Sequence, residues 1–200
     1  MKHGPNGDRG RLVVITGPSG AGKGTLIRKL VERRPDLEVA VSATTRPRRE
    51  NEVDGVDYHF LSEGEFVARI ERGELLEHVR YVSGHRYGTL RSEVERIRAA
   101  GRSCILELET EGARRVKELE PDSMTIFVTT PSFAELERRL RDRATESAGE
   151  IEERLDLARR QTEEKDDFEH VVVNDDVERA VAELDSLIAR APANAGARQA

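Results

Sequence analysis

The chain has 200 residues, which is the size of one domain with a core of its own. Its formal net charge of -6 argues against a protein that binds nucleic acid polymers, and its single cysteine, Cys104, excludes an internal disulfide. No apolar run approaches the roughly 20 residues that a membrane span needs, and the opening MKHGPNGDRG lacks the apolar stretch of a signal peptide. We therefore expect a cytoplasmic protein that crosses no membrane and whose polar ends, residues 1–9 and 191–200, are disordered.

Apolar runs and helical stripes alternate along the chain. The uninterrupted apolar run at 12–15 predicts a strand buried on both faces, and a helix is expected over 25–34. Further strands are predicted at 103–109, 124–128 and 170–173. Apolar side chains at helical spacing form three stripes: Leu90, Val94 and Ile97; Phe133, Leu136 and Leu140; and Val177, Val181, Leu184 and Ile188. This order predicts an α/β fold with a mainly parallel sheet covered by helices on both faces.

Two segments interrupt this alternation. Residues 37–88 carry β-like pieces, turn residues and one short helix near 62–72, which is typical of a small mixed α+β insertion. Residues 141–165 are almost wholly polar. We expect both segments to be insertions that lie over the active face of the sheet.

The first predicted strand runs into a glycine-rich turn that opens the first predicted helix, which is the context that a phosphate-binding loop requires. The loop consists of Gly17, Pro18, Ser19, Gly20, Ala21, Gly22, Lys23, Gly24 and Thr25. Its glycines let backbone N–H groups converge on phosphate oxygens, while Lys23 places a cation against the β- and γ-phosphates of a nucleotide. Gly24 stands where the general motif has Ser or Thr, which leaves open which hydroxyl, if any, meets Mg²⁺. A glycine-rich turn without a ligand is disfavoured, because motif and context agree.

Five further motifs follow the loop. They are Ser42-Ala43-Thr44-Thr45-Arg46-Pro47-Arg48-Arg49, Glu52-Val53-Asp54-Gly55-Val56-Asp57-Tyr58, Leu76-Glu77-His78, Tyr87-Gly88-Thr89 and Val173-Asn174-Asp175-Asp176. Together with the loop, and in this order, they closely resemble the guanylate kinase family over about residues 12–190. The resemblance implies a three-layer P-loop fold in a single guanylate kinase-like domain, 1–200. Its expected parts are a core at 11–36, 89–137 and 166–190, a GMP-binding subdomain at 37–88 and a helical lid at 138–165.

The resemblance implies a pocket for GMP as the phosphoryl acceptor. The residues expected to hold the acceptor phosphate are Arg46, Arg49, Tyr58 and Tyr87. Arginine forks and tyrosine hydroxyls both suit phosphate oxygens. Ser42 and Glu77 would read guanine, because a carboxylate can accept from N1–H and the N2 amine together while a hydroxyl donates to O6. Adenine would leave that carboxylate unpaired, which can give on the order of 10⁴-fold discrimination.

Three more residues are expected at this pocket. Thr89 stands where the family has serine or threonine, so it would assist with the base or cap the helix that begins near Leu90, and the cap is slightly favoured. Glu107 and Glu109 lie two apart on a predicted strand, so both should point to one face. The family usually has aspartate at the second position, so Glu109, expected to help recognise the base, is one methylene longer. Two exposed glutamates on a half-buried strand are the alternative.

The resemblance also implies a donor side that binds ATP. Beyond the phosphate loop, the residues expected to bind or cover ATP are Arg139, Arg143, Arg154 and Asn174. The three arginines would swing over the phosphates and exclude water. Asn174 would lie near the adenine, although a turn-forming asparagine is nearly as well supported. Mg²⁺ is expected with ATP, held by no side chain directly and contacted through water by Thr25 or Glu107. The neighbouring arginines expected on solvated helix faces are Arg138, Arg141, Arg159 and Arg160.

The activity that the resemblance implies is ATP + GMP ⇌ ADP + GDP, by direct in-line transfer without a covalent enzyme intermediate. The residues expected to be catalytic are Lys23, Arg46, Arg143 and Arg154. We expect dGMP as a second acceptor and a role in GMP recycling within purine nucleotide metabolism. A kinase that acts on a phosphorylated sugar is disfavoured by the base-and-phosphate pocket, and a scaffold module that binds protein partners is disfavoured by the intact phosphate loop. The choice between monomer and homo-oligomer is left open.

Overall fold

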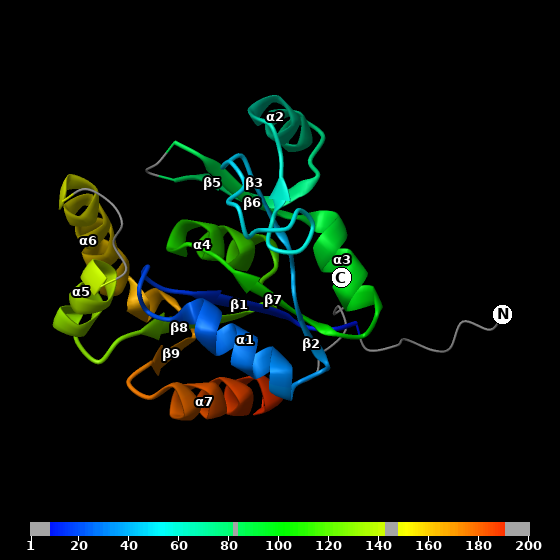
Figure 1. Ribbon diagram of the computed structural model, residues 1–200. Coiled ribbons are helices and arrows are strands. Elements are labelled where there is room, and N and C mark those ends of the chain that lie inside the picture. The colour runs from blue at the N-terminus through cyan, green and yellow to red at the C-terminus, as the bar shows by residue number, and fades with distance from the viewer. Residues whose placement is uncertain (1–8, 82–83, 143–147, 191–200) are drawn as a thin grey trace.

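The computed structural model describes residues 9–81, 84–142 and 148–190, which form two sheets and their covering helices (Figure 1). Within these residues the larger sheet has five parallel strands in the order β2-β7-β1-β8-β9. The strands are β1 (Leu12–Thr16), β2 (Leu37–Val39), β7 (Ser103–Glu107), β8 (Met124–Thr129) and β9 (His170–Val173). Because β1 is central, every one of its residues is buried, as its uninterrupted apolar run predicts.

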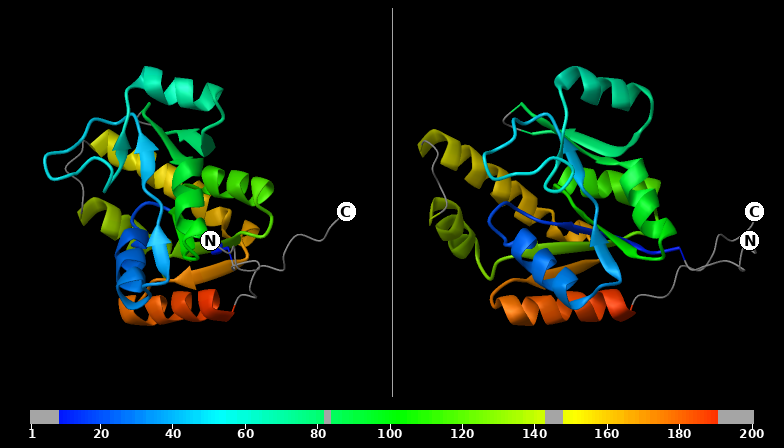
Figure 2. Two further views of the ribbon diagram at one scale, coloured as in Figure 1. Left: turned by 90° about the vertical axis from the view of Figure 1, so that its right-hand side faces the viewer. Right: turned by 45° about the vertical axis from the view of Figure 1, so that its right-hand side comes forward.

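Helices cover both faces of the five-stranded sheet (Figure 2). They are α1 (Lys23–Arg33) and α7 (Val177–Arg190) on one face, and α3 (Arg91–Ala99) and α4 (Thr110–Leu119) on the other. The central strand divides its side chains between these layers with the two-residue period of a strand. Val13 and Ile15 pack with apolar side chains of α1 and α7, whereas Leu12 and Val14 pack with those of α3 and α4. The predicted three-layer α/β fold is confirmed.

The second sheet stands above the first in Figure 1 and has the strand order β4-β3-β6-β5. Its elements are β3 (Ser42–Thr44), β4 (His59–Phe60), β5 (Leu75–Arg80), β6 (Arg86–Leu90) and the helix α2 (Glu63–Glu71). The sheet is mixed, because β3 pairs in parallel with β4 and antiparallel with β6. A separate small core of Ala43, Phe66, Leu75 and Leu90 holds α2 against it. The mixed α+β insertion that the sequence predicts is therefore present.

The boundaries of this insertion differ from the predicted range 37–88 at both ends. The strand β2 falls inside that range but pairs with β7 in the five-stranded sheet, and its Leu37 is buried in the core beneath α1. At the other end Thr89 and Leu90 complete β6, which belongs to the second sheet. Three residues are too few to show a strand pattern, so only the pairing partner identifies β2 as core.

The polar stretch near 141–165 is helical where the structure describes it. The elements there are α5 (Phe133–Asp142), α6 (Ala148–Glu163) and a short 3-10 helix (Lys165–Asp167). A few apolar residues suffice to join α5 to α6, since Leu136, Leu140, Leu155 and Ala158 form a buried cluster of their own. Among the described helices none is long and apolar enough to cross a membrane. Arg143 and both predicted disordered ends, apart from Arg9, lie outside the described residues.

Candidate active site

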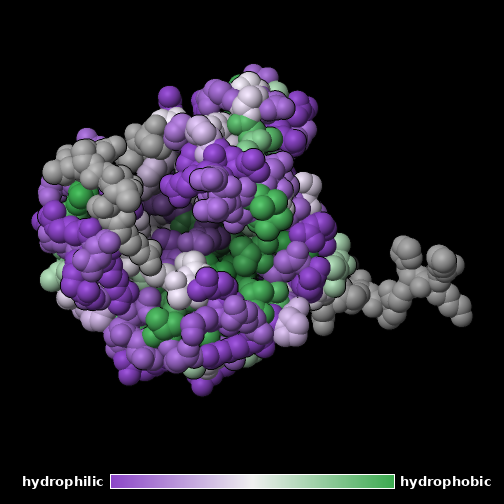
Figure 3. All heavy atoms as spheres, in the orientation of Figure 1, coloured by the Kyte–Doolittle hydropathy of each residue, from purple (hydrophilic) through white to green (hydrophobic). Residues whose placement is uncertain are grey.

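A cleft of about 350 Å³ lies between the two sheets, above the ends of the strands β1 and β7 (Figure 3). The carboxyl ends of parallel strands are where ligands bind in open α/β sheets. The predicted site residues that line the cleft are Ser19, Lys23, Ser42, Tyr58, Glu77, Tyr87, Glu107 and Glu109. The structure therefore brings together side chains of the phosphate loop and of the predicted acceptor pocket, although they are spread over ninety residues of sequence.

The phosphate loop between β1 and α1 depends on its glycines. Gly17, Gly20 and Gly22 all have positive φ, at 134°, 89° and 92°, a conformation that side chains disfavour. Space is also lacking, because a Cβ on Gly17 would lie 2.1 Å from the carbonyl oxygen of Val128 on the neighbouring strand. A Cβ on Gly20 would lie 3.1 Å from Leu140, so α5 packs directly against the loop. The loop has a fixed shape set by its neighbours.

Lys23 is the first residue of α1 and reaches back across its own loop. Its ammonium Nζ donates to the carbonyl oxygens of Gly17 at 2.6 Å and Pro18 at 3.2 Å. A phosphate held by the loop would meet the same ammonium, together with the positive end of the α1 dipole. The geometry therefore suits anion binding at the start of α1.

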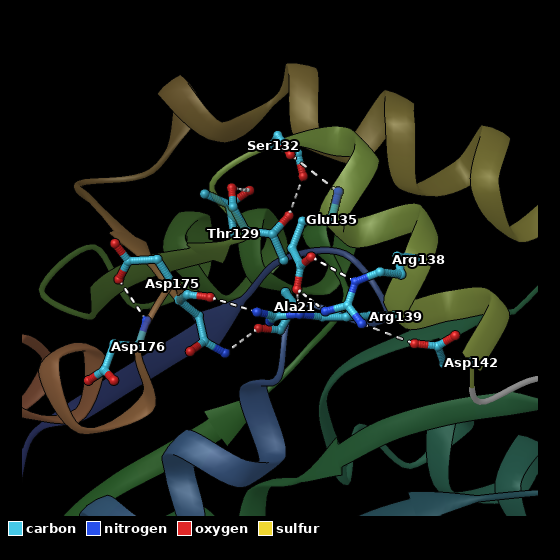
Figure 4. A network of polar contacts seen from close by, with 11 residues as sticks. Ala21, Thr129, Ser132, Glu135, Arg138, Arg139, Asp142, Asp175 and Asp176 are labelled. Atoms are coloured by element: carbon cyan, nitrogen blue, oxygen red, sulfur yellow. Dashed lines mark hydrogen bonds and ion pairs between the residues drawn. The ribbon is translucent and has the colours of Figure 1, made fainter.

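Asn174, just after β9, forms a side-chain hydrogen bond with the phosphate loop. Its side chain is 3% exposed, and its amide Nδ2 donates to the carbonyl oxygen of Ala21 at 2.7 Å. Its own backbone carbonyl accepts from Arg139 at 3.1 Å, and Arg139 also pairs with Glu135 at 2.7 Å (Figure 4). Asn174 is thus more than a turn former, because it ties β9, α5 and the phosphate loop together.

The other described arginines near the loop differ in their surroundings. Arg154 on α6 donates to Ser19 Oγ at 2.9 Å, which places this helix over the phosphate loop. Arg138, in contrast, has a side chain that is 63% exposed and pairs with Glu135 and Asp142 on its own helix (Figure 4). The expected lid arginine Arg143 lies outside the described residues.

Arg46 forms the centre of the expected phosphate-binding end of the acceptor pocket. Its guanidinium donates to both carboxylate oxygens of Glu52, at 2.6 and 3.0 Å, and lies 5.4 Å from the ring centroid of Tyr58. The rings of Tyr58 and Tyr87 are 6.0 Å apart. Arg49 joins the group through its backbone, whose N–H donates to Glu52 at 2.8 Å, while its side chain is exposed. Arg46, Tyr58 and Tyr87 therefore lie close together.

Glu52 is a residue of this site to which the sequence assigns no role. The hydrogen bonds from Arg46 lower the pKa of Glu52 to about 2, with the backbone N–H of Arg49 contributing next. Glu52 is therefore a fixed anion in the place where Arg46 would meet an acceptor phosphate. The sequence does indicate a possible ion pair, because Glu52 stands between two arginines and Tyr58. Its partner, however, depends on how the loop folds back.

Glu77 lines the pocket at its expected base-binding end. It is only 3% exposed, so it is not a solvated surface carboxylate. Burial raises its pKa to about 7, and a hydrogen bond from the Thr89 hydroxyl to Oε1 at 2.8 Å offsets part of that rise. Its second oxygen, Oε2, packs so tightly against α4 that a Cβ on Gly112 would lie 2.7 Å away. A buried acceptor with one oxygen already fixed is thus available for a ligand.

Thr89 does not cap a helix, which corrects the slightly favoured prediction. It is the fourth residue of β6, while α3 begins after Leu90 and has no side-chain cap. Because β5 and β6 pair antiparallel with Glu77 opposite Thr89, the hydroxyl faces the carboxylate directly. Ser42 is opposite Thr89 on the other side of β6, and Ser42 and Glu77 both line the cleft.

Glu107 and Glu109 both line the cleft, but they do not share a strand. The strand β7 ends at Glu107, and Glu109 occupies the N-cap position of α4. Burial raises the pKa of Glu107, even though solvent reaches the side chain from the cleft; Lys23 lowers that pKa and Glu109 raises it. The Oε2 atom of Glu109 accepts a 2.5 Å hydrogen bond from Gln161 on α6.

The donor set at the start of α1 fits a magnesium ion. The carboxylate of Glu107 faces this point, since a Cβ on Gly24 would lie 3.8 Å from its Oε2, and the partly exposed Thr25 follows. Mg²⁺ prefers oxygen ligands and usually binds through one or two carboxylates, several waters and substrate phosphates. No cluster of three metal-ligating side chains occurs among the described residues.

The five-stranded parallel sheet, the glycine-rich loop with its lysine and the cleft beneath a second lobe define a P-loop phosphotransferase. A family model described as guanylate kinase matches residues 9–191, and the chain belongs to this family. The resemblance that the motifs indicate is therefore confirmed, and the protein is an enzyme of the ATP-dependent nucleotide kinases.

Curated relatives and solved structures agree with this assignment. The guanylate kinase of Synechococcus sp. (strain JA-3-3Ab) is 47% identical over 92% of this chain and 84% of its own length. That of Rubrobacter xylanophilus is 48% identical over 91% of this chain and 95% of its own. The crystal structure of guanylate kinase from Anaplasma phagocytophilum matches with a TM-score of 0.74 and 28% identity, covering 91% of this chain and 86% of that one. A shikimate kinase from Bacteroides thetaiotaomicron, at 14% identity and a TM-score of 0.50, shares the fold alone.

Proposed function

We propose that this chain phosphorylates GMP, and also dGMP, with Mg-ATP by direct in-line transfer. The observation that carries the proposal is the buried carboxylate of Glu77 in the same cleft as Lys23 and the phosphate loop. Family membership supports ATP and GMP as the substrates. The distribution of charge supports GMP as the acceptor, because the carboxylate of Glu77 suits the guanine base and the guanidinium of Arg46 suits the phosphate.

The acceptor is bound at both of its ends. Glu77 accepts from N1–H and the N2 amine of guanine, and Ser42 donates to O6. Thr89 orients the Glu77 carboxylate, while Glu107 and Glu109 complete the base side. The residues that hold the acceptor phosphate are Arg46, Arg49, Tyr58 and Tyr87. Arg46 exchanges one or both of its hydrogen bonds with Glu52 for the phosphate, so that its charge stays paired throughout.

The donor is bound by the phosphate loop and α6. The loop residues are Gly17, Pro18, Ser19, Gly20, Ala21, Gly22, Lys23, Gly24 and Thr25. Lys23 leaves its own loop carbonyls for the β- and γ-phosphates, and Arg154 turns from Ser19 to the phosphates. Arg139 and Arg143 cover the nucleotide from the lid. The buried Oδ1 of Asn174, which has no hydrogen-bond partner among the described residues, supports its contact with the adenine amine.

Catalysis on this proposal is positioning and charge stabilisation. Lys23, Arg46, Arg143 and Arg154 surround the transferring phosphoryl group from both substrates, and closure of α6 excludes water, which suppresses hydrolysis of ATP. Glu107 or Thr25 would hold the Mg²⁺ that arrives with the nucleotide, and the ion would supply positive charge against the nucleotide phosphates. The acceptor phosphate oxygen attacks directly, so no side chain carries a covalent intermediate.

The test is ADP formation from Mg-ATP with GMP, dGMP, IMP, AMP, CMP or UMP as acceptor. We expect strong turnover with GMP and dGMP, weaker turnover with IMP, which lacks the N2 amine, and background rates with the others. Lys23→Ala should lower kcat by about 100-fold or more while GMP binding persists. EDTA should stop the reaction, and excess Mg²⁺ should restore it. Absence of GMP-dependent turnover in the wild-type protein would overturn the proposed function.

A further inference from the structure

Gln161 is a buried polar residue to which the proposed chemistry assigns no role. It lies near the end of α6 and is 5% exposed. Its amide Nε2 donates to Oε2 of Glu109 across 52 residues of sequence, at 2.5 Å. A buried amide that donates to a carboxylate makes one of the stronger kinds of hydrogen bond in proteins. Few residues on the polar helix α6 are so completely enclosed, which indicates a specific function for this side chain.

Glu109 stands on the wall between two cavities. One is the cleft of about 350 Å³ that holds the proposed acceptor site, and the other, of about 320 Å³, lies between β5, α4 and α6. The charged residues that line the second cavity with Glu109 are Arg80, Glu111, Arg114, Arg160 and Glu164. Three cations on that side can attract the Glu109 carboxylate away from the acceptor. Gln161 lines the same second cavity, and its hydrogen bond to Oε2 fixes the Glu109 carboxylate at the wall between the two cavities against this attraction.

The helix α6 carries a second contact with the active site on the same face. Arg154 precedes Gln161 by seven residues, which is two turns of helix, so both side chains project from one side. Arg154 reaches Ser19 of the phosphate loop, and Gln161 reaches Glu109 at the edge of the acceptor pocket. One helix face thus contacts the donor site and the acceptor site together.

We propose that Gln161 is a positioning residue for acceptor recognition. It holds the longer Glu109 side chain toward the guanine base, and it makes the geometry of the acceptor pocket depend on the position of α6. This inference rests on the proposed role of Glu109 as a reader of the base. It explains how a glutamate can serve where the family resemblance leads us to expect a shorter aspartate.

The test is a double-mutant cycle between Gln161→Met and Glu109→Asp, read out as KM and kcat for GMP and ATP. Gln161→Met keeps the volume but removes the donor, and Glu109→Asp withdraws the carboxylate by one methylene without touching α6. We expect Gln161→Met to raise the KM for GMP about tenfold, with the KM for ATP and kcat changed less than about twofold. In the Glu109→Asp background the same substitution should have no further effect on the KM for GMP.

Two controls make the outcome decisive. Glu163→Gln, on the exposed side of the same helix end, should leave every constant unchanged. Thermal unfolding of each variant shows whether a change in KM follows from loss of the fold. An unchanged KM for GMP in Gln161→Met, with a fully active wild-type enzyme, overturns the inference and leaves the proposed function standing. An equal effect in both backgrounds assigns Gln161 to the support of α6 alone and overturns it as well.

Discussion

The pKa values of single glutamates in this site are set by their hydrogen bonds and burial. Glu52 and Glu77 are both glutamates of the acceptor pocket, yet their pKa values move in opposite directions, to about 2 and about 7. Hydrogen bonds from Arg46 stabilise the charge of Glu52, while burial beside the neutral hydroxyl of Thr89 destabilises that of Glu77. Glu52 thus remains an anion at physiological pH, and Glu77 lies close to its own titration point.

Acidification should therefore weaken GMP recognition through Glu77. Below pH 7 the neutral acid predominates, and it cannot accept from both N1–H and the N2 amine of guanine. We expect the KM for GMP, relative to the KM for ATP, to rise several-fold between pH 8 and pH 6. The Glu77→Gln variant should have a higher KM for GMP that lacks this rise. A wild-type ratio that tracks the variant across the range would contradict the assignment.

Glu77 should also make the stability of the fold depend on pH. Stability should fall as the pH rises, whereas recognition of GMP should improve. Because its folded pKa of about 7 lies above the ordinary value of 4.5, its stabilising contribution is complete below pH 4.5 and disappears as the pH rises through 7. The shift corresponds to on the order of 3 kcal/mol. Urea unfolding should show that Glu77→Gln gains stability relative to wild type between pH 5 and pH 8. The reverse trend, or a constant difference, would show that burial does not set this pKa.

Gly112 on α4 should be required for the placement of Glu77. A Cβ there would lie 2.7 Å from Oε2, so alanine must displace the carboxylate. We expect Gly112→Ala to raise the KM for GMP about tenfold and to leave the KM for ATP unchanged, in steady-state assays. Gly64→Ala is the matched control, because Gly64 also lies in a helix, α2, but has open space around its Cα. Its KM values should stay at wild-type levels while helix stability rises by up to about 1 kcal/mol.

At the scale of elements, the phosphate loop shows how distant segments fix a short one. The loop spans residues 17–25, but its shape depends on Val128 of β8, Leu140 of α5 and Asn174 after β9. Each of these contacts restricts the backbone conformations that the glycine-rich loop could otherwise adopt. A rigid loop presents its backbone N–H groups without the entropy cost of ordering them when the nucleotide binds.

Removal of the Asn174 amide should loosen this loop. Asn174→Ala leaves the carbonyl oxygen of Ala21 without its buried donor, which costs about 1–3 kcal/mol. We expect the KM for ATP to rise by about tenfold and the KM for GMP to change less than twofold. Asn51→Ala, at an exposed position, serves as the control. A rise in the KM for GMP alone would assign Asn174 to the acceptor side instead.

At the scale of the whole molecule, the protein has two lobes with separate cores. The small core around Phe66 shares no residue with the two clusters that cover the five-stranded sheet. The cleft lies between these lobes (Figure 3), and both Lys23 and Glu77 line it. The strand β5 also contributes Leu76 to the cluster that packs with α3 and α4, so this strand connects the two lobes.

This division predicts that the acceptor lobe can be weakened on its own. Phe66 is fully buried, so Phe66→Ala should cost about 3–5 kcal/mol in the stability of the second sheet. Hydrogen exchange should accelerate in α2, β3, β5 and β6 but not in β1 or β8. Calorimetry should show loss of GMP affinity with ATP affinity retained. Equal acceleration in both sheets would mean that the lobes fold as one cooperative unit.

The site could be predicted from sequence where its residues stand in motifs, and not where they meet across the fold. Lys23 and its loop were recognisable, because the strand, the glycines and the helix are consecutive. Glu52 and Gln161 were not assigned, since their partners Arg46 and Glu109 are identified only once the loop 45–58 and α6 have packed. The sequence slightly favours a helix cap over a role at the base for Thr89, because its place on β6, opposite Glu77, depends on the register of two strands.

The sequence by itself determined the α/β class, the phosphate loop and the family, because local periodicity and consecutive motifs carry that information. It also placed the central strand, whose run of four apolar residues requires burial on both faces. Only the tertiary structure decided that β2 joins the core sheet, that Glu77 is buried beside Gly112, and that α6 contacts both Ser19 and Glu109. The physical reason is that burial, pKa and hydrogen-bond partners are properties of side chains from distant segments, and no single segment contains them.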